Sequence, residues 1–123
     1  MLIPYMNRVL KQRVFTDTEQ INHVNVLDDI GEMLYEAQPE SMRSDEFEAV
    51  SLRLLEISDY ERCKKWCDRA VIQYPTALSS YTCQLKLYFS TEEKEAFFRV
   101  LDELRQSGIT IDRETLDLIR VFL

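Results

Sequence analysis

Three cysteines and a single histidine are the side chains of this sequence best suited to covalent or metal chemistry. Cys63 and Cys67 are four positions apart, which places both thiols on one face of a helix, and Cys83 follows later in the chain. A zinc site needs a fourth ligand and a tighter spacing, and a disulfide between helical positions four apart would be strained. We therefore expect buried, reduced core thiols and no bound metal, which favours a reducing compartment.

The histidine offers no recognisable catalytic arrangement. His23 lies between Asn22 and Val24 in an acidic segment, and no motif places a nucleophile and an orienting acid beside it. Gly31 stands alone, so the sequence contains no glycine-rich phosphate loop. We expect His23 at the surface, no catalytic residues, no enzyme activity and no cofactor.

The charge of the chain is strongly segregated. Residues 1–15 carry a net charge of +3, residues 16–50 carry −9 and residues 51–123 carry −1, which together give −7. An acidic chain repels phosphate backbones, so direct nucleic-acid binding is disfavoured, and the acidic block is interpreted as a solvated face. No apolar run approaches the roughly 18 residues that a membrane span requires, and no signal peptide is recognised. The expected location is cytoplasmic, away from a membrane.

Helices are the elements that must position any functional side chain. Only two glycines and three prolines occur, and apolar residues recur at spacings of three and four. Ser44, Asp59 and Asp112 are predicted helix caps, and Gly108 is a predicted left-handed stop. The predicted helices span about 3–15, 17–37, 45–57, 60–74, 76–89, 92–106 and 113–123.

Residues 58–75 resemble the second helix of a tetratricopeptide repeat. The turn, the aromatic residue, the small packing residues and the closing proline of that motif are matched by Tyr60, Cys63, Cys67, Ala70 and Pro75. Counting back gives a repeat unit of 34 residues, 44–77, and a degenerate second unit follows at 78–111.

Two weaker resemblances belong to the same fold superfamily. The stretch from Leu101 to Asp112 is similar to a pentatricopeptide repeat, whose relatives bind single-stranded RNA through long arrays. Gly108-Ile109 and Glu114-Thr115 have the spacing found in the bacterial transcriptional activator domain, a helical module attached to DNA-binding heads.

These resemblances imply an all-α fold of about seven helices. Antiparallel helical hairpins would form a right-handed superhelical stack in one domain, 1–123. It would comprise N-terminal helices in 1–40, unit one at 44–77, unit two at 78–111 and a capping helix at 112–123. The N-terminal helix is interpreted as an intramolecular cap; the alternatives are a connector to an upstream domain and a dimerisation element.

The tetratricopeptide resemblance also implies a protein-binding groove on the first helix of each unit, and so a non-catalytic protein–protein interaction module. The groove lacks the cationic set that clamps a peptide carboxylate, so the expected ligand is a basic or amphipathic peptide or protein. The alternative is a regulatory or oligomerisation domain of a bacterial transcription regulator whose DNA-binding part lies outside this chain, and a two-unit stack can also form a homodimer. Leu52 and Phe89 could instead pack against the N-terminal helices. The predicted groove residues are Asp45, Glu48, Leu52, Glu56, Thr82, Lys86 and Phe89.

Overall fold

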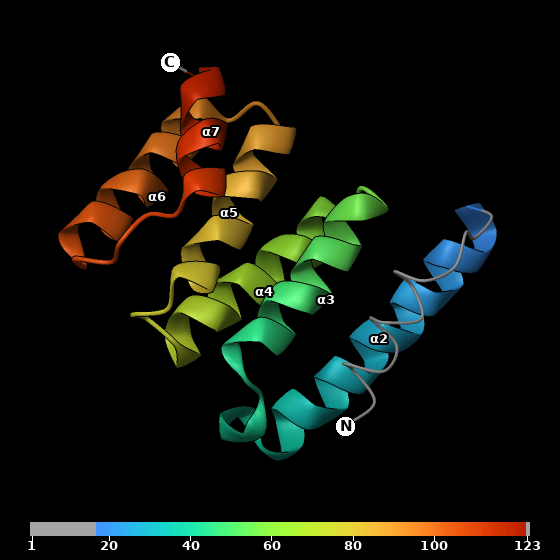
Figure 1. The fold of residues 1–123 in the computed structure, drawn as a ribbon. Helices are drawn as coiled ribbons and strands as arrows, with labels where there is room; N and C mark the ends of the chain where they lie inside the picture. Colours follow the sequence, from blue (N-terminus) through green and yellow to red (C-terminus); the bar gives the residue numbers. More distant parts are fainter. Residues whose placement is uncertain (1–16, 123) are drawn as a thin grey trace.

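The computed structural model describes residues 17–122, which form an all-helical protein (Figure 1). The predicted first helix, 3–15, and Leu123 lie outside the described residues. In Figure 1, α2 lies at one end of the row of helices, and α6 and α7 lie at the other. The elements are α2 (Asp17–Ala37), the 3-10 turn η1 (Pro39–Ser41), α3 (Ser44–Glu56), α4 (Tyr60–Gln73), α5 (Leu78–Ser90), α6 (Lys94–Gln106) and α7 (Arg113–Phe122).

Side-chain caps define the beginnings of α4 and α7 as predicted. A carboxylate oxygen of Asp59 accepts a hydrogen bond from the backbone N–H of Arg62, at 3.1 Å. Asp112 accepts from the backbone N–H of Thr115 at 2.9 Å. Each bond satisfies a donor that has no partner inside the first turn of the helix. Gly108 has a φ of 73°, which confirms the left-handed stop after α6.

Other predicted helix starts were wrong by one or two residues. Ser44 is the first residue of α3, and Arg43 is the N-cap because its backbone N–H donates to Glu46 Oε1 at 3.0 Å. The predicted start of α6 at Glu92 fails because Glu92 has a φ of 59°, in the left-handed region, and the helix begins at Lys94. α5 begins at Leu78, two residues after the predicted start.

The backbone repeats itself at an interval of 34 residues. Ser44 and Leu78, the first residues of α3 and α5, are 34 positions apart, and so are Tyr60 and Lys94, which begin α4 and α6. The turns correspond as well, because Ser58 and Glu92 are the described non-glycine residues with positive φ, at 60° and 59°. The backbone N–H groups of these turns donate at the same offset, Ser58 to Leu55 and Glu92 to Phe89. The two hairpins therefore have first helices of the same length and the same connection, and their second helices, α4 and α6, differ by one residue, with 14 and 13 residues.

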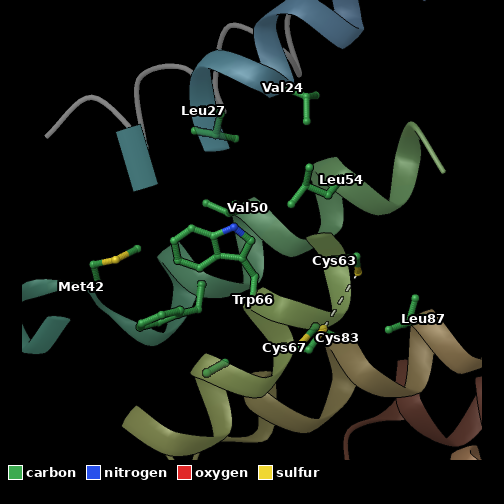
Figure 2. Close-up of a cluster of buried hydrophobic side chains, with 12 residues drawn as sticks. Val24, Leu27, Met42, Val50, Leu54, Cys63, Trp66, Cys67, Cys83 and Leu87 are labelled. Carbon is green, nitrogen blue, oxygen red and sulfur yellow. Dashed lines mark hydrogen bonds between the residues drawn. The ribbon is translucent and has the colours of Figure 1, made fainter. Parts of the chain in front are cut away.

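Packing joins these helices into a continuous row. α3 contacts α4 and α5, α4 contacts α5, and α5 contacts α6 and α7. One buried cluster unites α2, α3 and α4 with part of α5 around Trp66 and Phe47 (Figure 2), and a second unites α5, α6 and α7 around Phe97. Tyr88 of α5 packs against both clusters and so links them.

Charged side chains attach α2 to α4. Asp28 of α2 is only 5% exposed, and its carboxylate accepts hydrogen bonds from Trp66 Nε1 at 2.7 Å and from Arg62 Nη1 at 3.1 Å. One turn further along α2, Glu32 pairs with Lys65 at 2.5 Å and with Arg69 at 2.8 Å.

The prediction of a solvated acidic face was therefore wrong for Asp28 and Glu32. Lys65 and Arg69 of α4 both reach the neighbouring helix through these pairs. A buried charge whose partner is removed is costly, so this set of pairs fixes which turn of α2 lies against α4.

Candidate functional site

A pocket of about 480 Å³ opens between α3, α5 and α7. These are alternate helices of the row, so the pocket spans both hairpins and the last helix. Its lining residues come from one position in α3, several in α5, and α7 with its N-cap: Glu48, Leu78, Ser79, Thr82, Leu85, Lys86, Asp112, Glu114, Thr115, Asp117, Leu118 and Val121.

The pocket combines an apolar lining with short polar side chains. Leu85 is fully buried and belongs to the core cluster shared by α5, α6 and α7, while Val121 is 68% exposed. Ser79 and Thr82 are short side chains on the α5 wall, and they leave open space that larger residues would fill. Leu78, Leu118 and Val121 are the lining apolar residues with exposed surface, so a ligand could bury an apolar side chain against them, with polar partners within reach.

Carboxylates dominate the charge of the pocket. Glu48, Asp112, Glu114 and Asp117 stand against one ammonium group, that of Lys86, so the lining has a formal charge of −3. Lys86 Nζ lies 2.8 Å from Glu114 Oε1 and joins α5 to α7.

The carboxylate of Asp112 is held in its ionised form. Its hydrogen bonds with Thr115 lower the pKa of Asp112 below the ordinary value, and the positive charge of Lys86 lowers this pKa further. The pocket is therefore anionic at neutral pH and complementary to a cation beside an apolar group.

Three of the seven predicted groove residues line this pocket: Glu48, Thr82 and Lys86. Glu48 and Thr82 approach each other across α3 and α5, with Thr82 Oγ1 donating to Glu48 Oε2 at 3.4 Å. The structure thus brings together predicted residues from both hairpins.

The other four predicted groove residues lie elsewhere. Asp45 pairs with Arg43 at 3.0 Å, and Glu56 pairs with Arg53 on its own helix at 3.0 Å. Leu52 is half-buried outside the pocket lining.

Phe89 packs against Phe122 of α7, with ring centroids 4.9 Å apart. The alternative placed Phe89 against the N-terminal helices, but among the described residues Phe89 packs in the cluster of α5, α6 and α7. Phe89 therefore helps to hold α7 beside α5.

Sequence reasoning missed the contribution of α7. Asp112, Thr115, Leu118 and Val121 were assigned to a capping helix, although they form one wall of the pocket. The available signal was their regular spacing of three from the N-cap, which makes each residue a neighbour of the next on the surface of the helix.

The cysteines lie in the core, as predicted. Cys63, Cys67 and Cys83 are free and buried, and the Sγ atoms of Cys63 and Cys67 are 4.0 Å apart (Figure 2). Hydrogen bonds with Cys63 and Cys83, together with burial, raise the pKa of the Cys67 thiol well above its ordinary value. Such a thiol is a poor nucleophile at neutral pH.

The single histidine of the sequence contacts the backbone of its own helix, α2. His23 is partly exposed, and its Nδ1 lies 2.8 Å from the backbone oxygen of Glu19. Between residues 17 and 122, no group of three or more His, Cys, Asp or Glu side chains is arranged to hold a metal ion.

Comparisons with protein-family models, with curated proteins and with solved structures found no match. Within the described part of the chain, no helix combines the length and the hydrophobicity needed to cross a membrane. The pocket between α3, α5 and α7 is therefore the feature that points to a function.

Proposed function

We propose that this protein is a non-catalytic interaction module that binds a basic, amphipathic segment of a partner protein in the pocket between α3, α5 and α7. The observation that carries this proposal is the pairing of an apolar lining with four carboxylates in one opening of about 480 Å³. Charge complementarity favours a cationic partner, and burial of an apolar side chain would supply affinity.

The proposal includes a stack of tetratricopeptide-like units. The 34-residue offset between α3–α4 and α5–α6 supports it, as does the succession of contacts from α3 to α7. In such a stack the first helices of successive units line one surface, and the pocket uses α3, α5 and α7 in that order.

The test is a selection of peptides from a random display library on the intact chain, followed by affinity measurements on a pocket variant. We expect enrichment of peptides that combine lysine or arginine with large apolar residues. Val121→Lys removes an apolar contact and adds a cation to the pocket. It should therefore lower the affinity of the protein for the selected peptides about tenfold.

Ile72→Lys is a closely matched control. Ile72 is 70% exposed and is the penultimate residue of α4, whereas Val121 is 68% exposed and is the penultimate residue of α7. Both variants place a lysine near the negative end of a helix dipole, so both should fold. Equal affinity of the selected peptides for the two variants, or enrichment of acidic peptides, would contradict the proposal.

Self-association provides a separate outcome. If the library yields no pocket-dependent peptide and the chain forms dimers in analytical ultracentrifugation, the interaction-module proposal fails. The alternative of an oligomerisation domain from a transcription regulator is then favoured.

A further inference from the structure

Lys86 stands where the cation of a ligand would bind. Its ammonium group lies 2.8 Å from Glu114 Oε1, and its charge also acts on the carboxylate of Asp112 at the beginning of α7. Among the pocket-lining residues, all within the described chain, Lys86 is the one base. The ammonium group of Lys86 thus partly neutralises the carboxylates that would attract a ligand.

We infer that Lys86 is an internal competitor for the ligand's cation and sets the affinity and charge selectivity of the pocket. This inference rests on the proposed function, since it concerns the same site. A lysine or arginine of the partner would share or take over the carboxylate of Glu114, and the flexible stem of Lys86 would let its ammonium group move toward solvent.

The ammonium group of Lys86 reduces the negative charge of the pocket. Lys86 holds the formal charge of the lining at −3, and its removal would make the charge −4. The side chain of Glu114 is 72% exposed, so water screens its pair with Lys86 and the pair contributes little to folding. Exchange of this pair, in which Glu114 is exposed and Lys86 is 30% exposed, for a ligand pair is therefore feasible without loss of the fold.

Lys86→Met tests the inference because methionine keeps a long unbranched stem and removes the charge. The probe is a short fluorescein-labelled amphipathic peptide of leucine and lysine, and binding is measured by fluorescence anisotropy. We expect Lys86→Met to bind this peptide about two- to fivefold more tightly than the unmodified chain at low salt. The gain should disappear near 1 M salt, where the screening length is about 3 Å.

Lys64→Met is the matched control. Lys64 also forms an ion pair, with Asp68 at 2.9 Å, and its loss changes the net charge of the chain by the same amount outside the pocket. An equal gain in Lys64→Met would attribute the effect to overall charge and overturn the inference. A second probe with glutamate in place of lysine should not gain affinity for Lys86→Met.

Failure of this inference is distinguishable from failure of the proposed function. Unchanged or weaker binding of the lysine probe by Lys86→Met overturns the role of Lys86, even when library peptides still depend on Val121. If the unmodified chain, Lys86→Met and Lys64→Met all fail to bind the probe, the inference about Lys86 is also overturned. The library selection tests separately whether the pocket binds peptides. Circular dichroism melting of each variant verifies that the compared proteins are folded.

Discussion

Gly31→Ala should destabilise the protein, although alanine is the better helix former. Gly31 is buried within α2, and a Cβ built there would lie 2.9 Å from both Cη2 and Cζ2 of the Trp66 ring. The indole cannot move away easily, because its Nε1 donates to Asp28 at 2.7 Å and the ring lies against Phe47 with centroids 5.9 Å apart. Either the ring or α2 must therefore shift.

The expected magnitude follows from two opposing effects. Replacing glycine with alanine inside a helix contributes about 1 kcal/mol of stability. Forcing an extra methyl group into a packed interior costs about 1–3 kcal/mol, and displacement of Trp66 would also weaken its hydrogen bond to Asp28, worth about 1 kcal/mol or more. We expect a net loss of about 1–2 kcal/mol in the free energy of unfolding, because the overpacking and hydrogen-bond costs together exceed the helix gain.

Urea denaturation monitored by circular dichroism measures this loss. Asn22→Ala, at an exposed position of the same helix, is the control for helix propensity and should leave stability unchanged or raised. In a Trp66→Leu background, where the ring is absent, Gly31→Ala should become neutral or stabilising. A stabilising effect of Gly31→Ala in the unmodified protein would refute the reasoning that Trp66 lies against the backbone of α2.

Acid titration and thiol labelling give two more predictions. Burial raises the pKa of Glu32, but its hydrogen bonds and ion pairs with Arg69 and Lys65 outweigh this effect and leave the pKa below the ordinary value. The stability that these pairs contribute should be complete above about pH 5 and should decline as the pH falls below about 4. The melting temperature of Glu32→Gln should therefore depend less on pH in this range than that of the unmodified protein. The thiol of Cys67 and its two neighbours should react with a disulfide reagent only on unfolding, and rapid labelling of the native protein would contradict their burial.

The helices were predictable because local signals determine them. Apolar spacing and the carboxylate caps Asp59 and Asp112 are properties of short segments, and the structure contains both caps. The start of α6 was not predictable in the same way, because a glutamate seldom adopts the left-handed φ of Glu92. Glu92 adopts this φ because the turn between α5 and α6 has the same geometry as the turn at Ser58 between α3 and α4.

The buried carboxylate of Asp28 shows why the ion pairs between α2 and α4 were not predicted from the sequence. Acidic residues beside an apolar stripe are usually solvated, and only contacts between distant segments reverse this. A usable signal was present in α4, where Arg62, Lys65 and Arg69 recur at spacings of three and four on either side of Trp66. A buried indole N–H needs an acceptor, and a basic helix face needs an acidic neighbour.

The pocket arises from differences between two hairpins that share one backbone plan. At matching positions 34 residues apart, the first hairpin has Asp45 and Glu48, and the second has Ser79 and Thr82. The shorter side chains lie where α7 runs beside α5, so the space that longer residues would occupy remains open. The position that Asp45 occupies at the surface of the first hairpin thereby becomes a pocket wall at Ser79 in the second. Its affinity for a cation is then supplied by Glu48 from the neighbouring unit and by the carboxylates of α7.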